Sequence, residues 1–158
     1  MTLPQQPAVI RTSMLSPAVT AAFGFVVYAL AMLTGEVFAV NADSHPEHAH
    51  QHTFWESVTG LLPEFAIGLL GVAIAVLVGR HAWRGQPSRL GWTALVLAII
   101  AVVAVPAFWA GWANVFGAVA VGLALENRRR VGSIGAAASA LVLGSLAFVA
   151  ATAISVLG

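Results

Sequence analysis

From residue 17 onward, the sequence consists of apolar stretches separated by short polar segments. A helix crosses the hydrocarbon core of a bilayer with about 20 consecutive apolar residues, and several of these stretches approach that length. Only 8% of the residues are charged, whereas soluble domains carry roughly a quarter. So few polar side chains cannot cover a water-soluble core. The sequence therefore predicts an all-α integral membrane protein.

We expect a single bundle of five transmembrane helices that follows a cytoplasmic tail at residues 1–16. Ser16 and Pro17 are typical of a helix start, with serine at the N-cap and proline at the first helical position. A His-rich extracytoplasmic loop at residues 41–53 joins the first two helices. The five expected helices cover residues 17–40, 54–79, 90–108, 113–126 and 131–157.

The arginines predict the orientation of this bundle. Beyond Arg11, they lie in two groups next to expected helix ends: Arg80, Arg84 and Arg89 in one, and Arg128, Arg129 and Arg130 in the other. A cytoplasmic N-terminus places all seven arginines on the cytoplasmic side, as the positive-inside rule requires. Five of the six acidic residues then fall in the outer half, and the C-terminus is extracytoplasmic. We also expect the run at 128–130 to contact anionic lipids.

Two alternatives to this topology remain open. The first apolar stretch resembles a signal peptide with a cleavage site near Val40, but it exceeds the usual 7–15-residue apolar core. Residues 90–126 can instead form one long, broken or re-entrant segment. That would leave four helices and place Arg89 and Arg128 on opposite sides of the membrane.

The longest polar segment between two apolar stretches, residues 41–53, holds four of the five histidines. Clustered imidazoles beside carboxylates suit Zn²⁺, Cu²⁺ or Ni²⁺, and alternate residues of an extended strand point to one side. A solvated connector and a pH sensor are the alternatives, because histidine changes charge near pH ~6.5. The candidate metal ligands are His45, His48, His50 and His52.

Glu36 and Glu64 are the candidate buried ionisable residues. Charged side chains inside the hydrocarbon are unfavourable and normally face the bundle interior or a water-filled pocket. Two carboxylates that face each other can hold a proton or a cation between them. The alternative is a shallow Glu64 that reaches the lipid headgroups or accepts a hydrogen bond from Asn114, Thr59 or Tyr28.

Small residues recur every four positions near the end of the chain, at Gly132, Ala136, Ala140 and Gly144. Such a face lets two helices approach closely in lipid. It predicts either ordinary packing inside the bundle or an interface between copies of the chain.

Residues 92–148 combine an apolar helix (TALVLAIIAVVAVP), a small-residue helix that ends in arginines (VFGAVAVGLALENRRR) and a Gly/Ala-rich helix (GSIGAAASALVLG). This pattern resembles small actinobacterial multipass membrane proteins that have no assigned function. The resemblance implies a hairpin followed by one further helix. Where that family usually has a glycine in the last helix, this chain has Ala140.

Several classes of function are excluded by residue content. The chain has no cysteine and no lysine, which excludes thiolate sites and Schiff-base chemistry. We expect a non-enzymatic protein of the bacterial plasma membrane, without a bound cofactor, that acts as an accessory or interaction subunit. Its partners would be lipids and other membrane subunits or further copies of itself, and not nucleic acid. The alternative is an extracytoplasmic divalent-metal binder or permease component, and an intramembrane enzyme is a third, weaker possibility.

Overall fold

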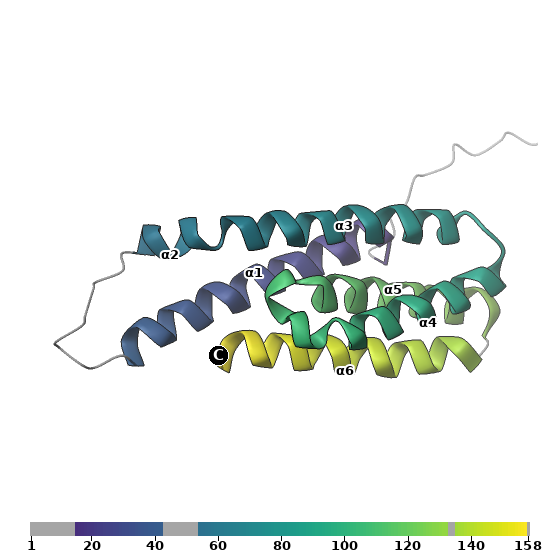
Figure 1. The fold of residues 1–158 in the computed structure, drawn as a ribbon. Helices are drawn as coiled ribbons and strands as arrows, with labels where there is room; N and C mark the ends of the chain where they lie inside the picture. The colour runs from purple at the N-terminus through teal and green to yellow at the C-terminus, as the bar shows by residue number, and fades with distance from the viewer. Residues whose placement is uncertain (1–14, 43–53, 133–134, 158) are drawn as a thin grey trace, which may run out of the picture.

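The computed structural model describes residues 15–42, 54–132 and 135–157, and within them it contains helices and no strand (Figure 1). The prediction of an all-α fold is therefore confirmed for this part of the chain. The helices are α1 (Pro17–Ala42), α2 (Phe54–Gly60), α3 (Leu62–Trp83), α4 (Pro87–Val103), the 3₁₀ helix η1 (Val105–Ala110), α5 (Trp112–Val131) and α6 (Gly135–Leu157).

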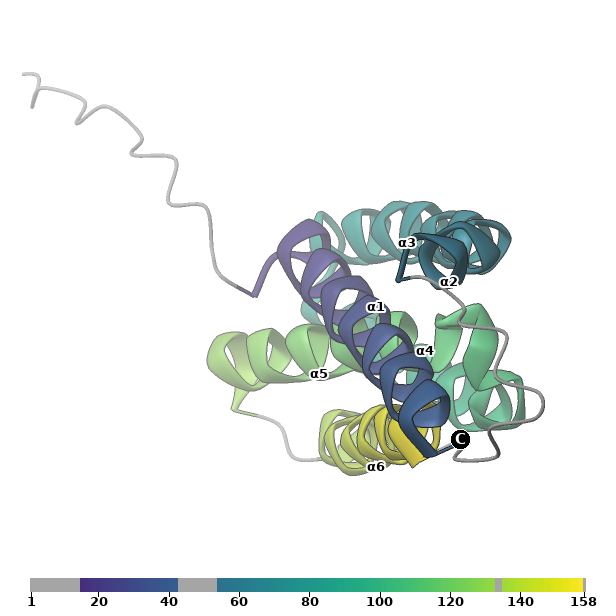
Figure 2. The same ribbon diagram turned by 90° about the vertical axis from the view of Figure 1, so that its left-hand side faces the viewer.

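The helix α5 is the centre of the bundle. It packs against α1, α3, α4 and α6, and most of its residues from Ala113 to Ala124 are buried. Figures 1 and 2 show α3 and α6 on opposite sides of the bundle, with α1 crossing from one to the other. The start of α1 lies against α3, where Pro17 contacts Gly79, and its end lies against α6, where Gly35 contacts Ser155.

In the described part of the chain, three helices are long and apolar enough to cross a membrane: residues 17–37 of α1, all of α3 and all of α6. We call these three helices the candidate spans. The apolar helix α4 is shorter. The central α5 carries four charged residues in its last six positions, so its apolar part of 14 residues covers only about 21 Å at 1.5 Å per residue. Spanning by α4 and α5 therefore stays a prediction.

The expected helix at residues 54–79 is in two pieces. The structure breaks it at Leu61, between α2 and α3, and Pro63 lies in the first turn of α3. Proline has no backbone N–H and clashes with the preceding turn, so it is tolerated at a helix start but not inside a continuous helix. The other end of this segment runs beyond residue 79, so Arg80 lies in the last turn of α3 and not in a loop.

The connection between α4 and α5 reverses the chain within a few residues. The helix α4 ends at Val103, and η1, which contains Pro106, follows it. Gly111 then adopts a left-handed conformation with φ of 69° and starts α5. The reversal between α4 and α5 therefore ends at a glycine whose backbone conformation other residues rarely adopt.

Candidate functional site

Glu36 of α1 and Glu64 of α3 lie within electrostatic range of each other. Both side chains are partly buried, and Glu64 is in the first turn of α3. The Oε2 atom of Glu64 is buried and has no hydrogen-bond partner among the described residues. A polar atom that is removed from water without a partner costs free energy. The fold therefore leaves this carboxyl group with an unsatisfied interaction.

Tyr28 of α1 fixes the packing next to this acidic pair. Its side chain is fully buried and lies within electrostatic range of Glu64. Its ring packs edge-on against Phe65 and at a tilt against Phe25, with ring centroids 6.0 Å apart in both pairs. Its hydroxyl donates a hydrogen bond to the backbone carbonyl of Trp109. Tyr28 thus joins α1 to α3 and to η1.

The three side chains that the sequence offers as hydrogen-bond donors to Glu64 donate to other acceptors in the structure. Each donates to a different acceptor: Asn114 to Thr152 Oγ1 at 2.7 Å, Thr59 to the carbonyl of Glu56 at 2.9 Å, and Tyr28 to the carbonyl of Trp109. The structure shows no hydrogen bond from any of these three side chains to Glu64, which was one form of the alternative; the other form, a Glu64 that reaches the lipid headgroups, stays a prediction. Backbone carbonyls accept from Thr59 and Tyr28, and the hydroxyl of the partly buried Thr152 accepts from Asn114.

Two neighbouring carboxyl groups can hold a proton between them or bind a cation. A transition-metal site normally needs three or four side-chain ligands. Among residues 15–42, 54–132 and 135–157, no group of three or more His, Asp or Glu residues is close enough to hold a metal ion. The proposed ligands His45, His48, His50 and His52 lie outside the described residues.

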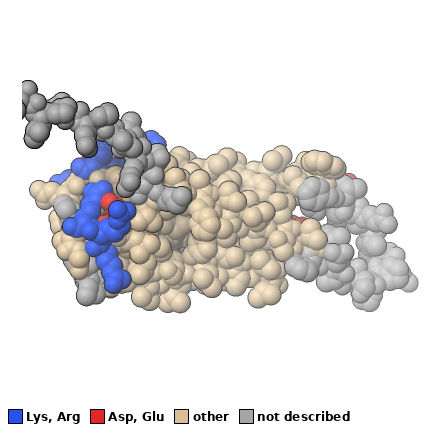
Figure 3. Space-filling view, turned by 180° about the vertical axis from the view of Figure 1, so that it is seen from behind, with Lys and Arg blue, Asp and Glu red and all other residues tan. Residues whose placement is uncertain are grey.

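The six described arginines lie at one end of the bundle (Figure 3). Arg130 has a structural role there. Its Nε atom donates to Glu126 at 2.9 Å, its terminal nitrogen donates to the carbonyl of Trp83 at 3.2 Å, and its guanidinium lies 5.1 Å from the centroid of the Trp83 ring. It therefore ties the end of α5 to the end of α3.

The remaining arginines at this end are available for external ligands. Arg80, Arg84 and Arg89 line a cleft together with His81. No ion pair to these three arginines is present in the described part of the chain. Arg128 is exposed, and Arg129 is 70% exposed with a single 3.6 Å ion pair to Glu126. Their exposure is compatible with the lipid contacts expected from the sequence.

The predicted small-residue face needs a correction. Gly132 is not on α6: it ends α5 with φ of 66°, and in the described part of the chain no side chain and no other helix lies within 4 Å of a Cβ built on it. Ala136 is only partly buried. Ala140 and Gly144 are buried, and the buried face of α6 continues through Ala137, Ala147, Ala151 and Ser155. Since α6 packs against α1, α4 and α5, this face is used inside the bundle.

A hydrogen bond between α5 and α6 was not predicted from the sequence. Asn114 is fully buried, and its amide nitrogen donates to Thr152 and, at 3.4 Å, to the carbonyl of Phe148. The available signal was an asparagine within an apolar stretch, because such a residue needs a partner when it is buried.

Comparisons with known proteins do not assign this arrangement to a family. No family model, no curated protein and no solved structure matches the chain. The resemblance of residues 92–148 to small actinobacterial membrane proteins therefore stays a prediction.

Proposed function

We propose that the chain is a small multipass protein of the bacterial plasma membrane and acts as a non-enzymatic accessory subunit of a larger membrane assembly. In this proposal α1, α3, α4, α5 and α6 span the bilayer. The arginine-rich end is cytoplasmic, in agreement with the positive-inside rule.

The observation that carries this proposal is the unsatisfied Glu64. Ionisable side chains within a membrane normally pair with a basic group, with another polar side chain or with water in a cavity. No ion pair joins Glu64 or Glu36 to a basic side chain in the described residues. Glu64 as a whole is only partly buried, so a donor from a partner helix that packs beside α1 and α3 would bind the part of its carboxyl group that is not enclosed by the bundle.

The surface of the candidate spans supports the same proposal. Only 22% of the residues in the most apolar stretches of α1 and α3 are buried within the bundle. Large aliphatic side chains such as Leu69, Leu70 and Leu77 are exposed along α3. In a bilayer, these faces are open to lipid or to a neighbouring helix.

Gentle extraction from the native membrane followed by native mass spectrometry tests this function. We expect the wild-type chain to co-purify with at least one other membrane subunit, and Glu64→Gln to weaken that association. Glu56→Gln on α2 is the matched control and should retain the partner. A chain that is always extracted alone, or an association that is unaffected by Glu64→Gln and Glu36→Gln, would contradict the proposal.

Divalent-metal binding is the second candidate function. In the sequence, the His-rich segment lies between α1, which carries Glu36, and α2, which leads into α3 with Glu64. In this alternative, a cation bound by the histidines would pass to Glu36 and Glu64. Metal analysis of the same preparation separates the two functions. Stoichiometric Zn²⁺, Cu²⁺ or Ni²⁺ that is lost when His45, His48, His50 and His52 are replaced by alanine would support a metal site. Metal content that does not depend on these histidines would rule it out.

A further inference from the structure

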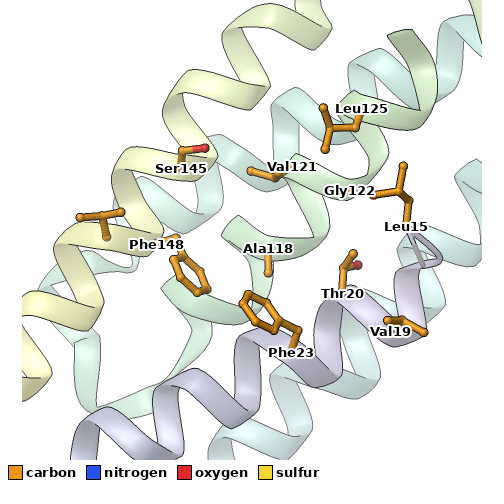
Figure 4. A pocket seen from close by; sticks show the side chains of 11 residues that line it. Leu15, Val19, Thr20, Phe23, Ala118, Val121, Gly122, Leu125, Ser145 and Phe148 are labelled. Carbon is orange, nitrogen blue, oxygen red and sulfur yellow. The ribbon is translucent and has the colours of Figure 1, made fainter. Parts of the chain in front are cut away.

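An apolar groove of about 410 Å³ opens on the side of the bundle between α1, α5 and α6 (Figure 4). Its lining is almost entirely hydrocarbon, and it includes Val19, Phe23, Val121, Leu125, Phe148 and Val149. The only side-chain hydroxyls in the lining are those of Thr20 and Ser145. The Thr20 hydroxyl already donates to the carbonyl of Ser16 at 3.2 Å.

The groove follows from the diagonal path of α1. At one end, α1 touches α6 closely, where Gly35 meets the carbonyl of Ser155. At the middle, the rings of Phe23 and Phe148 stack with centroids 5.9 Å apart and bridge the two helices. Beyond this pair α1 and α6 separate, and the groove continues between them to Leu125 of α5.

The groove ends next to basic side chains. Arg129 follows Leu125 by four residues on α5, so the two side chains lie on the same face of the helix, one turn apart. The Arg129 side chain is 70% exposed, and its one ion pair, with Glu126, is long at 3.6 Å. Arg128 beside it is exposed and has no ion pair among the described residues. The apolar groove and a cationic side chain therefore lie next to each other at the arginine-rich end.

We infer that this groove binds one acyl chain of an anionic phospholipid, whose phosphate is held by Arg129 with Arg128 beside it. The inference rests on the membrane location in the proposed function, but not on the partner subunit. The hydrocarbon lining matches an acyl chain, and the exposed guanidinium groups match a negatively charged headgroup at the inner membrane surface.

The size of the groove argues against a helix as its occupant. A helix with side chains is about 10 Å across, so each 5.4 Å turn fills roughly 400 Å³. The groove thus holds no more than one turn of a helix from a second copy or another subunit. A single hydrocarbon chain can lie along its whole length.

Native mass spectrometry of the delipidated full chain tests the inference with two lipids of identical acyl chains, phosphatidylglycerol and phosphatidylcholine. We expect one phosphatidylglycerol to bind more tightly than phosphatidylcholine. Arg129→Gln should weaken phosphatidylglycerol binding about fivefold, because one basic group near the surface contributes about that factor. It should weaken phosphatidylcholine binding less, because the choline cation of that lipid offsets the charge of its phosphate. Arg84→Gln, at the same end of the bundle but outside the groove, is the matched control.

A bulky side chain in the groove tests the acyl-chain site. Ser145→Trp should abolish binding of both lipids, whereas Ser139→Trp on the same helix should not, because Ser139 is exposed and does not line the groove. Val149→Trp is a second groove variant in case Ser145→Trp does not fold.

Equal binding of the two lipids by the wild type, or lipid binding that survives the groove variants, would overturn the inference. So would a dimer that the groove variants dissociate in the absence of lipid. Retention of the partner subunit is read separately with the Glu64 variant, so the two proposals can fail independently.

Discussion

Gly117 of α5 and Gly144 of α6 bring the backbones of these two helices into direct contact. A Cβ atom built on Gly117 would lie 2.8 Å from the carbonyl oxygen of Gly144, and one built on Gly144 would lie 3.1 Å from the carbonyl oxygen of Gly117. Without a hydrophobic driving force between helices in lipid, close backbone approach is a main source of packing energy. This crossing therefore fixes the position of α6 on the central helix.

The substitution Gly117→Ala should lower the thermal unfolding midpoint in detergent, with a loss of about 1–3 kcal/mol of stability, because the methyl group meets a backbone oxygen that cannot turn away. Helix propensity alone would predict the opposite effect, a gain in stability, because alanine is a better helix former than glycine. Gly135→Ala on α6 is the control, since no atom lies within 4 Å of its Cβ position. Equal midpoints for the two variants would show that the helices can separate at little cost.

The second prediction concerns the polar contact between the same two helices. Thr152→Val removes the hydrogen bond from Asn114 and leaves a fully buried amide without that partner. We expect a loss of roughly 1 kcal/mol, in the range measured for hydrogen bonds between membrane helices. Thr34→Val is a close control, because Thr34 and Thr152 both donate to a carbonyl four residues earlier, at 2.7 Å and 2.8 Å. A double-mutant cycle with Asn114→Ala that shows no coupling would contradict this assignment.

The turn before α5 offers a comparison of two glycines with nearly the same conformation. Gly111 and Gly132 have φ of 69° and 66°, so alanine at either position meets a similar backbone penalty of about 1–2 kcal/mol. At Gly111 the new Cβ would also lie 2.6 Å from the ring of Tyr28, whereas at Gly132 it meets nothing. Gly111→Ala should therefore lower the unfolding midpoint clearly more than Gly132→Ala. In a Tyr28→Val background, the difference should shrink, and a constant difference would place its cause elsewhere.

The sequence predicted the all-helical fold correctly, because an apolar stretch long enough to cross a bilayer has few other structures open to it. It did not predict which small residues pack. Residues spaced by four, such as Gly132, Ala136, Ala140 and Gly144, do not stay on one face of an α-helix, because the helix has 3.6 residues per turn. The observed face alternates steps of three and four, as from Ala137 to Ala140 to Gly144. Exposed and buried positions along α6 are both apolar, so hydrophobicity alone cannot separate them.

The acidic pair shows a different limit of the sequence. Glu36 and Glu64 were noticed because they interrupt apolar stretches, which is visible without a structure. The hydroxyl of Tyr28 holds α1 against η1 and is therefore not donated to Glu64. This arrangement depends on contacts between residues far apart in the chain, which the sequence does not show. The groove beside Arg129 also depends on the crossing angle of α1, which no local pattern encodes.

Arginine geometry is the subject of the fourth prediction. Arg130→Lys should lower the unfolding midpoint, because an ammonium group cannot donate to Glu126 and Trp83 together while stacking on the Trp83 ring. The expected loss is about 1 kcal/mol, since the site is partly exposed. Arg128→Lys keeps the same charge on the same turn and should have little effect. Similar midpoints for both variants would mean that only the charge at residue 130 matters.

The last prediction tests the membrane topology with single cysteines. The sequence contains no cysteine, so an introduced one is the only thiol that a reagent can label. Thr59 and Gln86 are exposed, and they flank the two ends of the candidate span α3. With the arginine-rich end in the cytoplasm, an impermeant maleimide should label Thr59→Cys in intact cells and Gln86→Cys only after the membrane is opened. The reverse pattern would invert the proposed orientation.

Trp109→Cys then decides between five spans and three. Trp109 lies in η1 and is 45% exposed. If α4 and α5 cross the bilayer, this cysteine should be labelled from outside as Thr59→Cys is. The apolar part of α5 covers about 21 Å of a hydrocarbon core roughly 30 Å thick, so a five-span protein must thin the bilayer locally or draw its polar ends inward at this helix. A cysteine at 109 that stays unlabelled in intact cells while Thr59→Cys reacts would mean that α4, η1 and α5 form a hairpin that stops within the membrane.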